Sequence, residues 1–370
     1  MKVVRYYPRA LNGDGGMTAA VHSWSRAAAM VGAQVSIVYD EAPPNGPTPP
    51  VEGVTLRAIK HRHVGGLSMP VGFAKCLRGA DVLVLHSGWT SHNLVAAAVA
   101  RRLGIPYVLE PRGAYDPHIV RRRLRTKSLW WHAAERRMVS KSLAVHLFFS
   151  SEREHLARLG YRGQVVIAPN GVHVPPGQKW DGGTGGYLLW LGRFDPEHKG
   201  LDLLLDAMAT IPAERRPLLR LHGPDWRGRK QHVVDMVAAR GLRDSVSVGQ
   251  AVRGEEKRSL QLRARAFVYP SRWEAFGNSV AEAAALGVPV LTTRYPLGVF
   301  LEERDAAVAS ASNAPALAVG IENVLAPGAA SLGAHGRDVV ETELRWESVA
   351  ESWLAQVTPL LGSKRSTDRW

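Results

Sequence analysis

Short, unbroken apolar runs alternate with longer segments of helical period along the whole chain. In the first half these runs predict strands at Val3–Tyr7, Val35–Tyr39, Val82–His86, Tyr107–Glu110, Val145–Ser150 and Val165–Ala168. Helical patterns lie between them, at about Met17–Val31, Ser91–Leu103, Arg122–Ser140 and Ser151–Leu159. Strands that helices cover on both faces read as continuous apolar runs, so the pattern predicts a doubly wound parallel sheet.

The second half repeats this alternation. Strands are predicted at Tyr187–Leu191, Leu218–His222, Val246–Val248, Ala266–Tyr269 and Val288–Thr292. Helices are predicted at about Leu201–Ala209, Lys230–Arg240, Gly254–Leu262 and Asn278–Leu286. The fold class expected is therefore α/β, with two Rossmann-like doubly wound parallel-sheet domains facing each other across a cleft.

A Pro- and Gly-rich stretch without periodicity separates the two halves and predicts a linker. We expect an N-terminal domain over residues 1–173, the linker over 174–186 and a second domain over 187–345. Residues 346–370 contain an amphipathic helix, Trp346–Val357, followed by a polar tail that we expect to be frayed. The Pro-rich stretch Ala42–Pro50 is expected to be a loop within the first domain.

Composition narrows the class of protein. The 370 residues suit two domains, and the single cysteine, Cys76, excludes a disulfide framework and a cysteine-based zinc site. No run of about 18 apolar residues occurs, so we expect a soluble or peripheral protein, located in the cytoplasm. The 47 Lys and Arg against 33 Asp and Glu give a net charge of +14, which suits nucleic acid, anionic membrane or phosphate-bearing ligands.

Ligands of open α/β sheets bind beyond the carboxyl ends of strands, so three strand-to-helix junctions are the candidate sites. The first, Asn12–Met17, contains Gly15 and Gly16, which let the backbone approach an anion, although glycines here also suit a simple turn. In the second, Arg193 and Lys199 flank one tight turn and suit a diphosphate, or are two solvated cations. The third, Pro270–Glu282, places Glu274 in a loop and Glu282 in the following helix.

These motifs, together with Pro169-Asn170-Gly171, occur in the order seen in one family. The chain resembles the "glycosyl transferases group 1" family, whose members are retaining, nucleotide-sugar-dependent glycosyltransferases with the GT-B fold. The resemblance covers nearly the whole chain and includes the helix that begins Trp346-Glu347-x-Val349-Ala350. In relatives that helix crosses back to pack on the first domain.

The resemblance implies a role for each motif residue. Arg193 and Lys199 would bind the donor diphosphate and stabilise the departing nucleotide, which is an electrostatic role. Glu274 would contact hydroxyls of the transferred sugar, helped by the backbone N–H groups of Ala275, Phe276 and Gly277. Glu282 would accept hydrogen bonds from the ribose. Gly15 and Gly16 would close over the diphosphate, and the strand end at Val248–Val252 would contact the base.

One position departs from the family pattern. Many relatives carry a histidine close to the reacting sugar after the fourth strand of the first domain, and this chain has Arg112 there, in Glu110-Pro111-Arg112-Gly113. An arginine cannot act as a base at neutral pH, but Arg112 suits holding the donor or an anionic acceptor. The alternative is an ion pair of Arg112 with Glu110 or Asp116 that only fixes the loop.

The resemblance also implies a front-face reaction in which the leaving phosphate takes the acceptor proton, with no protein nucleophile. A hydrolase pair of Glu274 and Glu282 is disfavoured, because Glu282 suits the ribose. Relatives transfer without a metal, and no Asp-x-Asp motif occurs, so we expect neither metal nor cofactor. The pair His61 and His63 has ligand spacing but weak support as a metal site.

Half of the net charge falls on one segment. Residues 112–143 carry nine Lys and Arg and two acids, with a tryptophan pair in the middle. This pattern predicts contact with an anionic membrane surface or capture of a phosphate-bearing acceptor; a solvated helix face with one tryptophan in the core is the alternative. The residues concerned are Arg121, Arg122, Arg123, Arg125, Lys127, Trp130 and Trp131. No nucleic-acid recognition motif is visible.

The leading hypothesis is a hexosyl-type retaining glycosyltransferase of polysaccharide or glycoconjugate biosynthesis, at the inner face of the cell membrane. Its partners would be a nucleotide-sugar donor and a glycan, lipid-linked or small-molecule acceptor. A nucleotide-sugar epimerase on the same fold and a non-catalytic anion- or membrane-binding relative are the alternatives. The sequence does not identify the donor base, the sugar or the linkage.

Overall fold

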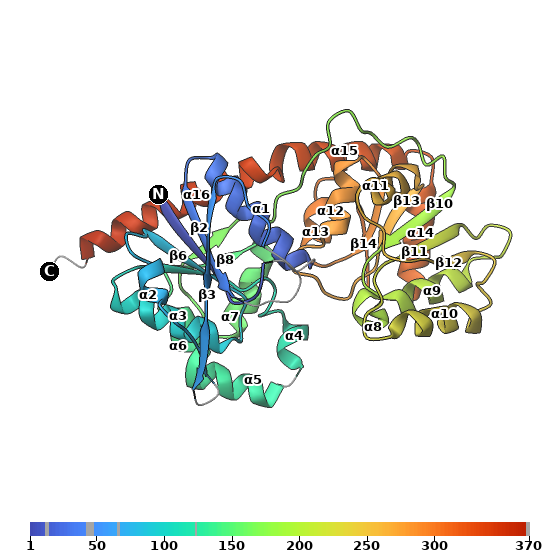
Figure 1. Cartoon of the computed structure of the whole chain (residues 1–370). Helices are drawn as coiled ribbons and strands as arrows, with labels where there is room; N and C mark the ends of the chain where they lie inside the picture. Colours follow the sequence, from blue (N-terminus) through green and yellow to red (C-terminus); the bar gives the residue numbers. More distant parts are fainter. Residues whose placement is uncertain (12–14, 42–47, 65–66, 123, 368–370) are drawn as a thin grey trace. The chain divides into compact units, whose positions relative to one another are not determined.

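The computed structural model describes residues 1–370 except 12–14, 42–47, 65–66, 123 and 368–370, and the side chains of 63–68 and 363–370 are not described. The chain forms two compact units (Figure 1). Unit 1 contains residues 1–171 and 346–370, and unit 2 contains residues 172–345. Most of the expected linker packs on unit 2: the Trp180 indole N–H donates to the Ala264 carbonyl at 2.7 Å, and Arg337 donates to the Gln178 carbonyl at 2.6 Å.

Unit 1 is built on a seven-stranded, all-parallel sheet in the order β3-β2-β1-β6-β7-β8-β9. The strands are β1 (Lys2–Tyr7), β2 (Gln34–Asp40), β3 (Val54–Ile59), β6 (Val82–His86), β7 (Tyr107–Glu110), β8 (Ala144–Leu147) and β9 (Val165–Ile167). A separate antiparallel hairpin pairs β4 (His61–Val64) with β5 (Leu67–Pro70). The helices are α1 (Gly16–Met30), α2 (Phe73–Cys76), α3 (Ser91–Arg102), α4 (Pro117–Arg121), α5 (Leu124–Trp130), α6 (Arg136–Ser140), α7 (Arg153–Arg158) and α16 (Trp346–Thr367).

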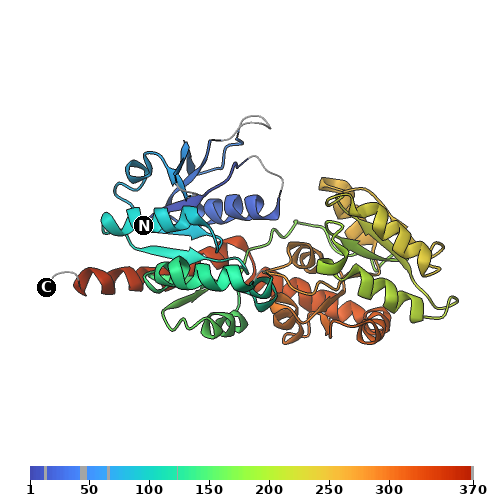
Figure 2. The same cartoon turned by 90° about the horizontal axis from the view of Figure 1, so that it is seen from below.

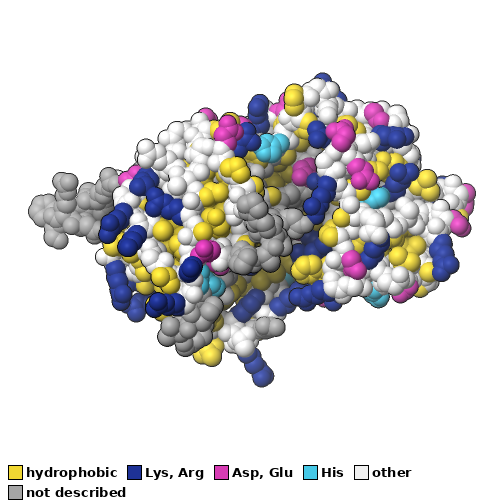
Figure 3. Space-filling view, in the orientation of Figure 1, with side chains coloured by type: hydrophobic (Ala, Val, Ile, Leu, Met, Phe, Trp, Pro, Cys, Tyr) yellow, Lys and Arg dark blue, Asp and Glu magenta, His cyan; other side chains and the backbone are white. Residues whose placement is uncertain are grey.

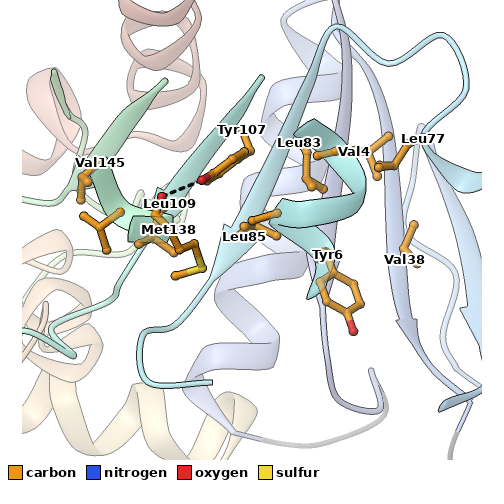
Figure 4. Packing of buried hydrophobic residues seen from close by; sticks show 14 of the residues in the cluster. Val4, Tyr6, Val38, Leu77, Leu83, Leu85, Tyr107, Leu109, Met138 and Val145 are labelled. Atoms are coloured by element: carbon orange, nitrogen blue, oxygen red, sulfur yellow. Dashed lines mark hydrogen bonds between the residues drawn. The ribbon is translucent and has the colours of Figure 1, made fainter. Parts of the chain in front are cut away.

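Alternate residues of the unit 1 strands enter two apolar clusters, one on each face of the sheet. Val4 and Tyr6 face α2, α3 and α6, in a cluster where the Tyr107 hydroxyl also donates to the Met138 carbonyl at 2.6 Å (Figure 4). Val3 and Val35 face α1 and α16 on the other side. Because both faces are buried, the strands read as continuous apolar runs, and the helices on either side are visible in Figure 2.

The carboxyl-terminal helix α16 completes the unit 1 core although it is far from that core in sequence. It packs along α1, and Trp353 is fully buried against the Arg5 guanidinium, 5.6 Å from the ring centroid. The Trp24 indole N–H donates to Asn170 Oδ1 at 2.9 Å and its ring meets Trp346 edge-on. Unit 1 is therefore closed by a helix that follows unit 2 in the chain.

Unit 2 has a six-stranded parallel sheet in the order β12-β11-β10-β13-β14-β15. Its strands are β10 (Tyr187–Leu191), β11 (Leu218–His222), β12 (Val246–Val248), β13 (Ala266–Tyr269), β14 (Val290–Thr293) and β15 (Val308–Ser310). Its helices are α8 (Pro196–Lys199), α9 (Leu201–Thr210), α10 (Arg229–Ala239), α11 (Gly254–Arg263), α12 (Asn278–Ala285), α13 (Pro296–Glu302), α14 (Ala314–Leu325) and α15 (Ala329–Glu343). The predicted fold class, α/β with two Rossmann-like parallel-sheet domains, is confirmed.

Two sequence expectations about elements were wrong, and some elements were missed, the edge strand β3 among them. The predicted helix Arg122–Ser140 is broken into α5, a π-helical turn at Trp131–Glu135 and α6. The expected frayed tail is helical as far as Thr367, because α16 continues through Pro359. The edge strand β3 was missed, since half of its side chains are exposed and its apolar run is interrupted. Residues 42–47 of the expected Pro-rich loop lie outside the described residues.

Among the described residues no single helix is long and apolar enough to cross a membrane. The pair α14 and α15 meets that test together, but it is bent by 91° at the break between them.

We predict that Trp353→Ala destabilises unit 1 by about 3–5 kcal/mol, the usual loss for removing a buried tryptophan. Denaturant unfolding followed by circular dichroism measures this change. The exposed residue Glu351 on the same helix provides the control, Glu351→Ala, which should leave unfolding unchanged. Equal stability of the two variants would show that α16 does not hold the unit 1 core.

Candidate active site

Two glycines allow close backbone approaches beyond the carboxyl ends of β10, β11 and β13 in unit 2. The chain leaves β10, forms the short helix α8 and ends it at Gly200, whose φ is +65°. A Cβ atom on Gly200 would lie 1.9 Å from the Pro270 carbonyl oxygen, so only glycine allows this approach. In the same way, a Cβ atom on Gly223 would lie 1.6 Å from the Gly192 carbonyl oxygen. The residue before Gly200, Lys199, is thereby placed beside the loop that follows β13.

Glu274 is the centre of the resulting cluster. Lys199 Nζ donates to its Oε1, and the hydroxyls of Tyr269 and Ser271 donate to the same oxygen at 3.2 and 2.8 Å. The Lys199 side chain is 8% exposed and that of Glu274 is 14% exposed, so the ion pair is largely shielded from water. The structure therefore joins two residues that are 75 positions apart and that the sequence singled out separately.

His198 connects this pair to Arg193. Its Nε2 lies 2.9 Å from the Trp273 carbonyl oxygen, and its ring stacks on the Trp273 ring with centroids 4.3 Å apart. A carbonyl can only accept, so Nε2 carries the proton and Nδ1 is left to accept from Arg193 Nη2, 2.9 Å away. The Arg193 guanidinium also lies 4.7 Å from the Trp226 ring centroid. The sequence analysis missed His198, although it lies inside the quoted motif.

The protonation states of His198 and Glu274 follow from their burial and from the charged groups next to them. Burial, and then the positive charge of Lys199, lowers the pKa of His198 to about 4, so the imidazole is neutral at pH 7. For Glu274 burial raises the pKa, but the charge of Lys199 and the hydrogen bonds from Lys199 and Ser271 outweigh it, and the pKa lies below its usual value. The cluster thus joins the ionised Glu274 to Lys199, and a second carboxylate, Asp195, lies 3.9 Å from Arg193 Nη2 and 3.7 Å from His198 Nδ1.

The start of α12 lies next to this cluster. Gly277 precedes the helix with a φ of +92°, and no side chain caps the first turn among the described residues. The positive end of the helix dipole favours an anion at this place. Ala275 is half-buried, while Phe276 is buried. Glu282, further along α12, accepts from Lys257 Nζ and keeps 39% of its side chain exposed.

In unit 1 the sequence candidates Gly15 and Gly16 lie where helix α1 begins. Gly15 and Gly16 are exposed at the start of α1, which has no side-chain cap and no acidic residue in its first turn. A Cβ atom on Gly15 would meet nothing within 4 Å among the described residues. Residues 12–14 of the same junction lie outside the described residues.

Arg112 forms the ion pair that the sequence left open as an alternative. Its Nη2 lies 2.6 Å from Glu110 Oε1, its side chain is 5% exposed, and its φ of +51° is unusual for a residue with a side chain. Glu110 is fully buried and also faces Arg5 at 3.4 Å and His86 at 3.1 Å. Burial raises the pKa of Glu110, but the charge of Arg112 and the neighbouring histidines hold it well below its usual value.

The basic segment differs from its sequence interpretation. Trp131 is 4% exposed, so it is a core residue, and the Trp130 indole N–H donates to the buried Glu135 carboxylate at 2.9 Å. Trp131 is therefore not an exposed membrane anchor, whereas Trp130 is half-buried. The exposed apolar side chains are Leu124 and Leu129, at 55% and 74%. Lys127 donates to the Ile119 carbonyl, whereas Arg121, Arg122 and Arg125 are exposed; Arg123 lies outside the described residues.

A pocket of 180 Å³ lies beneath these helices. Its lining is mainly apolar, with Trp89, Leu124 and Trp131, and two cations, Lys127 and Arg158, also line it. On the face drawn in Figure 3, Lys and Arg side chains are spread over both units and carboxylates are sparser. Unit 1 therefore offers a basic surface with apolar side chains at its helices α4 and α5.

The two halves of the chain match two family models. Residues 185–327 match "Glycosyl transferases group 1", and residues 15–171 match "Glycosyl transferase 4-like domain". The chain belongs to the group 1 glycosyltransferases. It is accordingly a glycosyltransferase. Both Lys199 and Glu274 lie within the matched segment 185–327.

Two curated relatives are similar to this glycosyltransferase in sequence. The O-antigen chain mannosyltransferase B of Escherichia coli is 30% identical over 154 residues, which are 41% of this chain and 40% of the relative. The GDP-mannose:cellobiosyl-diphosphopolyprenol alpha-mannosyltransferase of Xanthomonas oryzae pv. oryzae is 25% identical over 288 residues, 74% of this chain and 73% of the relative. The chain thus spans less than half of the first relative and about three quarters of the second.

Two solved structures share the fold. Sucrose-phosphate synthase from Thermosynechococcus elongatus has a TM-score of 0.77 at 19% identity, covering 98% of this chain and 99% of that one. HepE from Anabaena, in complex with UDP and glucose, has a TM-score of 0.71 at 14% identity, covering 98% and 100%. These similarities confirm the GT-B fold of the glycosyltransferase.

We predict that His198 makes stability depend on pH. Its pKa is lowered from 6.5 to about 4 in the folded chain, so between these values only the unfolded chain takes up the proton. Stability is therefore lost as the pH falls through this window, by roughly 2–3 kcal/mol. The free energy of unfolding of unit 2 at pH 7 and pH 4 measures it. His198→Gln should flatten this dependence, and His232→Gln, at an exposed position, should not; parallel profiles for both would contradict the assignment.

Proposed function

We propose that this glycosyltransferase transfers a hexose from a nucleoside-diphosphate sugar to an acceptor hydroxyl with retention of configuration. The observation that carries the proposal is the cluster of Arg193, His198, Lys199 and Glu274 beside the uncapped start of α12. Two cations and a helix N-terminus in one place form an anion site of the size of a diphosphate. A carboxylate beside them suits hydroxyls of the sugar.

The reaction needs stabilisation of the departing diphosphate more than it needs a protein base. Lys199 and Arg193 neutralise the charge that develops as the bond between the sugar and the phosphate oxygen breaks. Glu274, ionised at neutral pH, accepts hydrogen bonds from sugar hydroxyls and leaves the proton of the acceptor hydroxyl to the phosphate oxygen that departs. With these cations in place the transfer requires no metal ion and no cofactor.

The comparisons support a nucleotide-sugar donor. One relative is named for GDP-mannose, and the HepE structures contain UDP with glucose or UDP-glucose. Glu282 keeps part of its carboxylate exposed and suits the ribose hydroxyls, with Lys257 releasing it when the nucleotide binds. The backbone groups at Val248–Val252 are proposed to contact the base.

The acceptor is proposed to be a glycan intermediate carried on a lipid diphosphate, in polysaccharide or glycoconjugate biosynthesis. One relative is named for a diphosphopolyprenol substrate and another for O-antigen. On this chain, Leu124 and Leu129 project beside the exposed arginines of α4 and α5. Apolar side chains flanked by cations suit peripheral contact with the anionic inner face of the cell membrane, where such an acceptor is found. Arg112, paired with Glu110, is proposed to order the acceptor-side loop rather than to act as a base.

We predict that Lys199→Met lowers kcat/KM by about 10²–10³, the loss for removing one donor to a developing charge. It also leaves Glu274 as a largely buried, unpaired carboxylate, which lowers stability. The double variant Lys199→Met/Glu274→Gln removes both charges, and should regain thermal stability without regaining activity. Release of nucleoside diphosphate, measured with a panel of donors and acceptors, reports activity.

The control for this experiment is Lys179→Met, at an exposed lysine of unit 2. It should leave activity and stability unchanged. Full activity of the double variant would overturn the proposed site, since catalysis would then be independent of the pair.

We predict that reversing Arg121, Arg122 and Arg125 to glutamate weakens binding to vesicles of anionic lipid by at least tenfold, because each surface cation contributes about 1 kcal/mol. Co-sedimentation measures the binding. The control reverses the exposed Arg78, Arg101 and Arg102, which changes the net charge equally at another place in unit 1. Equal loss in the two triple variants would indicate a non-local charge effect and exclude α4–α5 as the contact.

A further inference from the structure

A second cluster of polar side chains lies in unit 1, formed by three residues outside the donor site. Asp40 is the last residue of β2, His61 is the first residue of β4, and His92 lies in the first turn of α3. One donor atom from each residue lies within 4.8 Å of the other two, and all three residues are half-buried. Two imidazoles and one carboxylate form a ligand set for a metal ion.

The sheet brings these residues together. Asp40 pairs with Ile59 in the β2–β3 ladder, and His61 follows two residues later. Asp40 Oδ1 and His61 Nε2 are 2.5 Å apart, and the rings of His61 and His92 have centroids 5.2 Å apart. Helix α3 packs against the other strand of the hairpin, β5, which places His92 on the same side. The three side chains therefore converge from three separate elements.

A buried hydroxyl lies beside the cluster. Tyr6 is fully buried, and its hydroxyl has no hydrogen-bond partner among the described residues. Tyr6 pairs with Val38 on the neighbouring strand, two residues before Asp40, and its ring is stacked on His61 at 6.5 Å and 9°. In Figure 4 the hydroxyl points away from the apolar side chains and along the direction of the parallel strands. Buried hydroxyls in folded proteins nearly always have a partner, so this one indicates a ligand.

We propose that Asp40, His61 and His92 bind one divalent transition-metal ion of the Zn²⁺ class, with the Tyr6 hydroxyl beside it. Imidazole nitrogen suits Zn²⁺ and Co²⁺, whereas Mg²⁺ and Ca²⁺ take oxygen ligands. Bonds of about 2.0–2.2 Å place tetrahedral donors roughly 3.4 Å apart, so a small movement of the side chains closes the site. Three protein ligands leave a fourth position open.

The ion would link the β4–β5 hairpin to the carboxyl end of β2 and to helix α3. None of its three protein ligands is a residue proposed above for the donor or for the transfer reaction. The proposal therefore stands whether or not the donor and acceptor proposed above are right.

The test uses the full chain with any affinity tag removed, after treatment with a chelator. Co²⁺ is titrated and its visible absorption followed, then Zn²⁺ is added as competitor; we expect one ion per chain and displacement by Zn²⁺. His92→Ala and Asp40→Asn should each weaken binding by at least tenfold. His132→Ala, at an exposed histidine of unit 1, is the matched control and should bind as the wild type does.

Tyr6→Phe keeps the ring and removes the hydroxyl, so it should weaken binding by a few-fold and leave the fold intact. If His61→Ala does not fold, His92→Ala and Asp40→Asn decide the matter, because neither contributes to the ring stack with Tyr6. Absence of stoichiometric Co²⁺ binding, or equal affinity of His92→Ala and His132→Ala, would overturn the site.

Discussion

The ion pair of Lys199 and Glu274 is the interaction on which the unit 2 site depends. It is largely shielded from water, so either charge without the other would be destabilising. The Tyr269 and Ser271 hydroxyls donate further hydrogen bonds to the carboxylate. The pair exists because Gly200 lets the α8 turn approach Pro270 more closely than any side chain would allow. A backbone constraint at one glycine thus places a cation and an anion where a diphosphate and a sugar can replace their mutual contact.

Unit 1 also contains a buried carboxylate that is held by ion pairs, that of Glu110. Arg5, Arg112 and His86 surround this fully buried carboxylate, and the Arg5 guanidinium also lies between the rings of Trp24 and Trp353. The carboxyl end of the unit 1 sheet is therefore joined electrostatically to the carboxyl-terminal helix α16. A histidine at the position of Arg112 would leave Glu110 with one fewer permanent cation.

The central strands could be predicted from sequence because helices bury both of their faces and the apolar runs are continuous. The edge strand β3 could not, since its exposed side chains interrupt the run. Arg193, Lys199 and Glu274 were visible as motif residues. The role of His198 depends on a tautomer that the Trp273 carbonyl fixes from 75 positions away. Trp131, which the sequence grouped with the membrane-contact candidates, is a core residue, as the alternative interpretation of one buried tryptophan allowed. Similarly, Asp40, His61 and His92 are distant in sequence, and only the packing of β2, the β4–β5 hairpin and α3 brings them together.

The central claim is that Lys199, Arg193 and the start of α12 form the diphosphate site. A crystal structure of the chain with a bound nucleoside diphosphate tests it most directly. The account predicts phosphate oxygens within hydrogen-bond distance of Lys199 Nζ and the Arg193 guanidinium, with Glu274 released from its contact with Lys199. A diphosphate bound elsewhere in unit 2, with the Lys199–Glu274 pair unchanged, would contradict it.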